Sequence, residues 1–278
     1  LSTTNTATIR SLNGSILDNG DTDVEIIASS AVLNAAVSIG TATNSLETQV
    51  SALEGSAGTD LYLNNLGALN LTAGGLSVTR NLEINSDQGI TDSGAITVGG
   101  DALFTTSAND SDITLDQLAV DGSIGLNASG AGSDVSIVNA TGINFQTGGA
   151  GGFLSATATT GDVLVGSGIA ISTGGALTLV AEDNFTLDPN ASLNAASVDI
   201  RIDNGNVGDA VDVVPLALVS GTITTSTTPF ATPAGAGTAG TRVTGGARTD
   251  IFSLAHSNSV ISVYGGDPSA TPGDSIAI

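Results

Sequence analysis

Closely spaced aspartates are the first residues of this chain that could do chemistry. Two stretches, DNGDTD and ANDSD, carry Asp18, Asp21 and Asp23, and Asn109, Asp110 and Asp112. Carboxylate and amide oxygens are the ligands that Ca²⁺ takes in protein loops. However, the stretch starting at Asp18 has no glycine at the sixth position of an EF-hand loop and no closing glutamate, and the calcium-binding nonapeptide GGxGxDxUx does not occur. Both stretches are therefore interpreted as acidic β-turns, and weak Ca²⁺ binding along the acidic surface stays an open alternative.

Paired carboxylates could also belong to a polysaccharide lyase or a glycosidase. Such enzymes need an acid and a base, or a cation beside the substrate, in one groove. Lysine is absent, and the five arginines are scattered along the chain at Arg10, Arg80, Arg201, Arg242 and Arg248. Aromatic platforms for sugars are scarce, since the chain has two tyrosines, Tyr62 and Tyr264, and six phenylalanines. We therefore expect no enzyme and assign no catalytic, cofactor or metal residue.

His256 is the one histidine, and Asp250 with Ser253 or Ser257 would complete a Ser-His-Asp set by composition. No G-x-S-x-G motif surrounds either serine, so a surface histidine in a loop is the better interpretation. The glycine run 148–152 resembles a phosphate loop, but no GK[ST] follows it, and we interpret it as a turn.

Composition excludes several classes of function. The 278 residues carry 27 acidic side chains against five arginines, for a net charge of -22. Phosphate binding needs clustered cations, so nucleic acid and anionic membranes are poor partners. The absence of cysteine removes disulfides, thiol nucleophiles and zinc-thiolate sites. The sequence contains no run of about 18 apolar residues, which is the length that would predict a membrane span.

The elements that would position these residues are short strands. Between Leu61 and Phe104 apolar residues alternate with small or polar ones, and Gly, Asn and Asp occupy the breaks. A two-residue period places the apolar side chains on one face of a strand. The glycine pairs at 74–75 and 99–100 stand 25 residues apart, a period that is typical of solenoids. The same alternation continues over residues 59–213.

These patterns predict an all-β parallel β-helix. A sandwich of this length would show longer strands and an aromatic-rich core, whereas the predicted inward positions here are mid-sized aliphatics. With roughly 20–25 residues per coil, residues 24–213 would make about eight or nine coils. One segment stays ambiguous: in 44–55, Asn44 and Glu47 could form a helical capping box, although the surroundings favour strand or irregular coil.

The remaining segments differ from this repeat. Residues 1–23 are predicted to be an N-terminal cap or incomplete coil. Residues 214–248 are rich in Thr, Ala, Gly and Pro and predict an excursion or linker. Residues 249–278 return to alternation and predict a short β module that continues in a longer protein. The chain starts at Leu1 without a signal sequence, which suits a piece of a larger exported polypeptide.

The stretches SLETQVSALEGSAGTDLYLNNLGALNLTAGG, LEINSDQGITDSGAITVGGDALFTT and DITLD resemble the β-strand repeats of filamentous-haemagglutinin-like surface proteins. The tail from 249 to 278 looks like an element that recurs between modules of such giant bacterial proteins. The resemblance implies a right-handed parallel β-helix that is secreted or surface-bound. The amino-terminal signature of two-partner secretion is absent.

From the residues and the resemblance together we expect a structural role outside the cell. The solenoid would form a filament, stalk or matrix by coil stacking or strand exchange, because open coil ends expose unpaired strand edges. The expected partners are further copies or adjacent repeats of the same large protein. An adhesin module that binds a glycan or cell surface is the alternative, and a polysaccharide-active enzyme is the third.

Overall fold

The computed structural model describes residues 1–203, 216–226, 240–246, 250–254, 261–265 and 275–277. Within these residues the chain forms parallel stacked strands and no helix, in a β-solenoid of about 10 turns. The predicted fold class is thereby confirmed. The chain divides into two compact units, Leu1–Val138 and Asn139–Ile278. No helix long and apolar enough to cross a membrane occurs in the described part of the chain.

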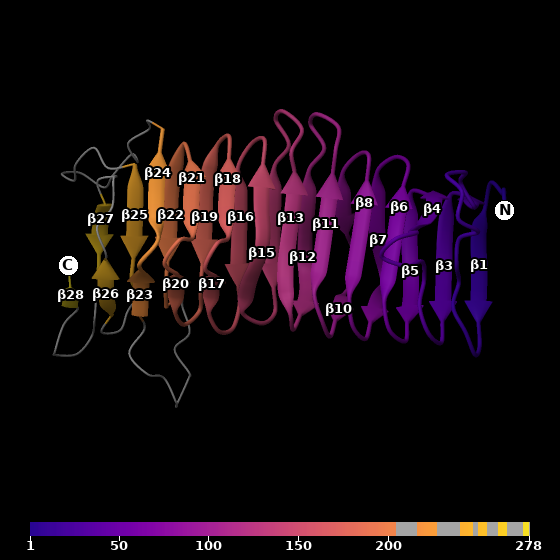
Figure 1. Ribbon diagram of the computed structural model, residues 1–278, viewed down its shortest axis with the longest axis horizontal. Coiled ribbons are helices and arrows are strands. Elements are labelled where there is room, and N and C mark those ends of the chain that lie inside the picture. The colour runs from indigo at the N-terminus through magenta and orange to yellow at the C-terminus, as the bar shows by residue number, and fades with distance from the viewer. Residues whose placement is uncertain (204–215, 227–239, 247–249, 255–260, 266–274, 278) are drawn as a thin grey trace. The chain divides into compact units, whose positions relative to one another are not determined.

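The first unit contains two parallel ladders (Figure 1). One ladder contains β1 (Thr6–Ser11), β3 (Ser30–Ala35), β5 (Ala52–Ala57), β7 (Leu69–Val78), β9 (Ile90–Asp92), β10 (Ile96–Val98) and β12 (Ile113–Val120). The other contains β2 (Ile26–Ile27), β4 (Leu46–Gln49), β6 (Leu61–Asn65), β8 (Leu82–Ser86), β11 (Ala102–Thr106) and β13 (Ser123–Ala128). Each coil therefore adds strands to both ladders, as a solenoid requires. The ambiguous segment 44–55 forms β4 and the start of β5 and is not helical.

The second unit contains the same kind of ladders. One contains β16 (Leu154–Ala158), β19 (Ala176–Val180), β22 (Ser197–Arg201), β25 (Thr241–Thr244) and β27 (Ile261–Tyr264). The other begins with β15 (Ile143–Ala150), which pairs with both β17 (Val163–Val165) and β18 (Ala170–Thr173). Two rows follow: β20 (Phe185–Leu187), β23 (Leu216–Val219), β26 (Ile251–Leu254) and β28 (Ser275–Ala277); and β21 (Ser192–Ala195) and β24 (Thr222–Thr225). The strand β14 (Val135–Asn139) contains the boundary between the units.

The core of each unit consists of columns of aliphatic side chains. In the first unit Leu63, Ile84, Phe104 and Leu126 are Cα partners on β6, β8, β11 and β13, and all four are fully buried. Neighbouring strands lie about 4.8 Å apart, so each side chain contacts its counterpart in the next coil. The alternation seen in the sequence thus becomes one apolar column for each inward position.

Side-chain amides and carboxylates link successive coils at the turns. The Asp60 Oδ1 atom accepts a hydrogen bond from the backbone N–H of Asn81 at 3.1 Å. The Asn81 Oδ1 atom accepts one from the N–H of Asp101 at 3.2 Å, and Asp101 Oδ1 accepts one from Ser123 at 2.7 Å. These partners are separated by 21, 20 and 22 residues, which is the coil length here. Asn and Asp are favoured at these turns because they cap the backbone of the next coil.

The 25-residue spacing of glycine pairs is not the coil length. A Cβ atom on Gly75 would lie 2.9 Å from the carbonyl oxygen of Ala95, whereas one on Gly99 would lie 2.4 Å from that of Thr79. The two glycines therefore occupy different places in their coils. The 25-residue glycine spacing correctly indicated a solenoid, but it does not equal the length of one coil.

Two apolar residues that continue the period-two alternation in the sequence, Val37 and Ala73, do not face the core. Val37 is 40% exposed because β3 ends at Ala35 and the alternation is interrupted there. Ala73 is exposed because β5 and β7 shift register between Leu53 and Gly55, so β7 carries extra residues at a bulge. A two-residue period holds only along an uninterrupted strand.

The arrangement of the core predicts that two leucines three residues apart, Leu63 and Leu66, contribute very differently to the free energy of unfolding. Leu63→Ala should lower the free energy of unfolding by about 2–5 kcal/mol, because it leaves a cavity within a buried column. Leu66→Ala is the matched control, because Leu66 is 49% exposed, and should cost less than about 0.5 kcal/mol. Chemical denaturation measures both, and equal costs would contradict the inward assignment of Leu63.

Candidate functional site

Three acidic side chains of the first unit meet beside β2 and β4. Asp18 lies in the loop after β1, Glu25 immediately precedes β2, and Glu47 lies on β4. One carboxylate oxygen from each lies within 4.8 Å of the others. The N–H of Glu25 donates to the carbonyl oxygen of Glu47 at 3.1 Å, so the two glutamates occupy neighbouring coils. The acidic cluster, as we call Asp18, Glu25 and Glu47, is thus a product of coil stacking.

The predicted loop of Asp18, Asp21 and Asp23 is only partly a cluster. Asp21 and Asp23 are exposed, and Asp21 Oδ1 accepts a hydrogen bond from the N–H of Asp23 at 2.9 Å, which makes a local turn. Glu25 and Glu47 were missed because nothing local connects them. The 22 residues between them, one coil length, are the signal that could have found them.

The cluster is electrostatically strained. Burial raises the pKa of the Glu25 carboxyl, and its hydrogen bond with Asp18 and repulsion from Asp18 and Glu47 raise it further. For Asp18, partial burial also raises the pKa, but hydrogen bonds from the Gly20 N–H, Asn44 and Glu25 outweigh it and lower the pKa overall. One oxygen of each acid (Asp18 Oδ1, Glu25 Oε2 and Glu47 Oε2) is buried and has no hydrogen-bond partner among the described residues.

Chemically, the cluster offers a hard cation three oxygens. Ca²⁺ takes six to eight oxygen ligands, so water would have to supply the rest. Without a cation, the same three groups destabilise the folded state whenever all of them are ionised.

The acidic cluster predicts an unusual pH dependence. Because folding raises the pKa of Glu25, its ionisation destabilises the fold above that pKa, and the penalty is relieved as the pH falls toward the ordinary glutamate value of 4.5. Glu25→Gln should therefore be more stable than the wild type at pH 7, and the difference should shrink on acidification.

Denaturation curves between pH 7 and pH 4, in a buffer free of divalent cations, measure this difference. Glu83→Gln on β8 is the control, since Glu83 lies outside the cluster. A Glu25→Gln protein that is less stable than the wild type at pH 7 would contradict the repulsive arrangement.

The second unit holds an arginine–aspartate cluster on its outer face. Asp199 on β22 receives hydrogen bonds from Arg201 Nε at 3.0 Å and from Arg242 Nε at 2.9 Å. Asp199 and Arg242 are Cα partners on β22 and β25, and the Asp199 side chain is buried. Burial alone would raise the pKa of the Asp199 carboxyl, but the hydrogen bonds and charges of Arg242 and Arg201 lower it overall.

The arginines are therefore less scattered than the sequence indicated. Arg201 and Arg242 are 41 positions apart in sequence, yet both bind Asp199. Of the two, Arg201 is 46% exposed. By contrast, Arg80 makes only a long pair with Asp60 at 3.8 Å and is 64% exposed.

Removing the central carboxylate should destabilise the second unit. Asp199→Asn removes charge-assisted hydrogen bonds to both arginines and should cost about 1.5–3 kcal/mol at pH 7. The lowered pKa stabilises the fold at neutral pH, and this stabilisation is lost as the pH falls below the ordinary aspartate value of 3.8 through the folded-state pKa. The difference between wild type and variant should shrink over that range.

Chemical denaturation as a function of pH provides the measurement. Asp188→Asn in the same unit is the control, because no hydrogen bond or ion pair involves the Asp188 side chain in the described residues. A pH-independent cost for Asp199→Asn would show that the ion pairs are not its cause.

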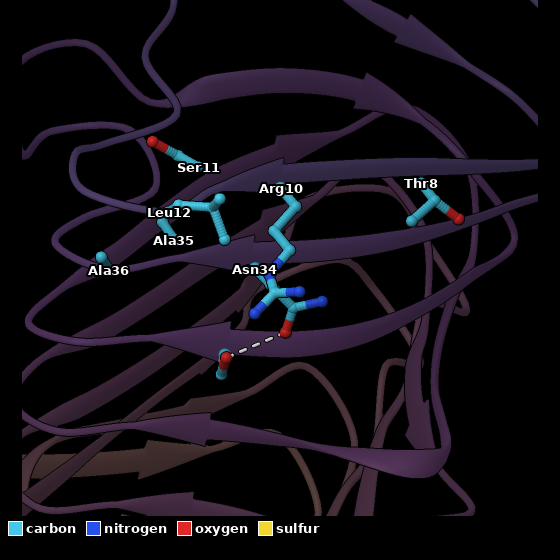
Figure 2. Close-up of a pocket in the computed structure, with 8 residues that line it drawn as sticks. Thr8, Arg10, Ser11, Leu12, Asn34, Ala35 and Ala36 are labelled. Atoms are coloured by element: carbon cyan, nitrogen blue, oxygen red, sulfur yellow. Dashed lines mark hydrogen bonds between the residues drawn. The ribbon is translucent and has the colours of Figure 1, made fainter.

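A third feature is a hollow of about 530 Å³ on the outer face of β1, β3 and β5 (Figure 2). Its lining residues are Thr8, Arg10, Ser11, Leu12, Asn34, Ala35, Ala36 and Ser56. Arg10, Asn34 and Ser56 are Cα partners across the three strands. The Ser56 hydroxyl donates to Asn34 Oδ1 at 2.9 Å. We call this feature the Arg10 hollow.

The other predicted sites resolve into structural roles. Asn109 Oδ1 accepts from the N–H of Ala131 at 3.0 Å, and Asp112 Oδ1 accepts from that of Asp134 at 2.8 Å, so this acidic stretch caps the next coil. The glycine run 148–152 was interpreted as a turn, but Gly148 and Gly149 lie within β15. Their flat backbone continues the pairing with β18.

The Ser-His-Asp set that composition allows, and that the sequence analysis rejected, is only partly within the described residues. Asp250 is fully buried and Ser253 lies on β26. His256, Ser257 and Arg248 lie outside the described residues. Tyr62 and Tyr264 lie on β6 in the first unit and β27 in the second.

Comparison with known proteins supports the repeat character of the first unit. Residues 58–127 match a family described as repeats of unknown function (DUF5649). This segment includes β6 to β12 and most of β13. No curated protein and no solved structure matches the chain.

Proposed function

We propose that this chain is a structural β-solenoid of a large secreted bacterial surface protein. In this role it builds a filament, stalk or matrix outside the cell by coil stacking or strand exchange with further copies or adjacent repeats. The proposal includes no catalytic activity and no nucleic-acid or membrane partner. The surplus of acidic side chains and the absence of lysine and cysteine support it.

The observation that carries the proposal is the edge strand β1. In the described residues β1 pairs with β3 on one side and with nothing on the other. The Ser11 carbonyl accepts a hydrogen bond from the N–H of Ala36. Bonding alternates along a parallel strand, so Ala7, Ile9 and Ser11 bond to β3. The backbone groups of Thr8 and Arg10 therefore point to the open side, where another strand could pair.

The coils that contain this open edge also expose apolar side chains. Leu1, Leu12 and Leu17 are each more than half exposed, and Ile27 on β2 is 41% exposed. All four belong to the first coils of the chain, whereas the leucines of later coils in this unit are mostly buried. Exposed apolar surface beside unpaired backbone groups is typical of an interaction site. A second coil stacked on this end would cover both.

The alternative role is an adhesin module that binds a glycan or a cell surface. One feature of the described residues favours it, the Arg10 hollow, because it is polar and lies on the outer face. A polysaccharide-active enzyme gains no support from any described cluster.

Blocking the open edge tests the structural role. Thr8→Pro removes a backbone N–H that bonds to no other strand in the first unit, and proline is tolerated on an edge strand. We expect wild-type protein to form linear assemblies at high concentration and the Thr8→Pro protein to stay monomeric. Sedimentation velocity and electron microscopy measure this difference.

Two controls separate the open edge from general damage. Thr8→Val keeps the backbone N–H and should assemble as the wild type does. Ile9→Pro removes a bond to β3 and should lower stability as well as assembly. Wild-type protein that remains monomeric at every concentration would refute the proposed self-association.

A further inference from the structure

We propose that the Arg10 hollow is a binding site for the carboxylate of a singly charged acidic saccharide. The hollow lies in the first unit and depends on residues from three consecutive coils. This inference goes beyond the structural role above and does not depend on it.

The lining of the hollow presents donors and no acid. Among the described residues Arg10 forms no ion pair, whereas Arg80, Arg201 and Arg242 each pair with an aspartate. Because Asn34 Oδ1 accepts from Ser56, the Asn34 amide directs its NH₂ group elsewhere as a donor. The hydroxyls of Thr8 and Ser11 complete the polar wall. A guanidinium beside an amide donor and hydroxyls suits a carboxylate, which accepts two parallel hydrogen bonds from arginine.

The nearest acid on these strands has its own partners. Glu54 lies on β5, two positions before Ser56, and does not line the hollow. Its Oε2 atom accepts from the N–H of Gly74 at 3.1 Å and from the Thr72 hydroxyl at 3.3 Å. Arg10 is thus an uncompensated cation in a chain with 27 acids.

Volume and charge narrow the ligand class. About 530 Å³ is much larger than a carboxylate and lies within the usual range for small-molecule sites. Leu12 and Ala36, both exposed, form an apolar side that suits the C–H face of a sugar ring. A net charge of -22 repels polyanions, so a saccharide with one carboxylate is favoured over an acidic polymer.

The experiment titrates the full chain with three probes and follows binding by ligand-observed NMR. D-Glucuronate is the acidic sugar, D-glucose is its neutral counterpart, and acetate is the carboxylate alone. We expect glucuronate to bind saturably and more tightly than either control. If glucose bound as tightly as glucuronate, the carboxylate would play no part in binding. If acetate bound as tightly as glucuronate, the sugar ring would play no part.

Two matched variants test the role of Arg10 in glucuronate binding. Arg10→Gln should weaken glucuronate binding roughly tenfold or more, because it removes the charge-assisted hydrogen bonds. Arg80→Gln, another exposed arginine of the same unit, should leave binding unchanged. Unchanged binding by Arg10→Gln would overturn the proposal, as would the absence of glucuronate binding to folded wild-type protein.

Sedimentation of the same variants distinguishes this site from the coil junction. Arg10→Gln keeps every backbone group of β1, so it should assemble as the wild type does. If Arg10→Gln abolished assembly and left glucuronate binding unchanged, Arg10 would belong to the junction and the saccharide site would be refuted.

Discussion

A single coil of this chain can neither bury its apolar face nor satisfy its backbone. Leu63 is fully buried only because strands of adjacent coils flank it, and the N–H of Asn81 is bonded only because Asp60 of the previous coil accepts from it. Stability is therefore a property of neighbouring pairs of coils rather than of any coil alone. The first coil has a neighbour on one side within the described residues, which is why leucines are exposed around β1.

Stacking of coils places side chains of the same type next to each other, and whether this stabilises the fold depends on the type of side chain. Aliphatic columns gain burial at every coil, and a turn aspartate or asparagine gains a backbone donor from the next coil. Carboxylates in the same relation repel, as Glu25 and Glu47 do with Asp18 nearby. At Asp199 the opposite solution is used, because arginine from the next strand of the ladder neutralises the buried acid.

The same logic explains where functional surface can exist. Interior positions are taken up by the columns and most turns by capping, so free chemistry is left to outer faces and coil ends. The open side of β1 and the Arg10 hollow both lie at the first coils. They differ in what they offer: β1 presents unpaired backbone groups, which suit another strand, whereas the hollow presents donor side chains without an acid, which suit a small anion.

The sequence by itself determined the class of fold. Period-two alternation, turn residues at the breaks and the scarcity of aromatic side chains are properties of the sequence alone, and they are sufficient to predict short strands in a solenoid. For residues 44–55 the surrounding sequence favoured strand or irregular coil over helix, and the segment forms strands.

Only the tertiary structure decided which residues share a column. Coil length varies between 20 and 23 residues even within residues 58–127, and the bulge in β7 moves Ala73 outward, so register cannot be extrapolated from one clear repeat. For that reason the 25-residue glycine spacing did not give the coil length. For the same reason the sequence did not predict that Glu47 lies beside Asp18 and Glu25. Arg242 likewise reaches Asp199 across 43 residues, a separation that no local pattern in the sequence indicates.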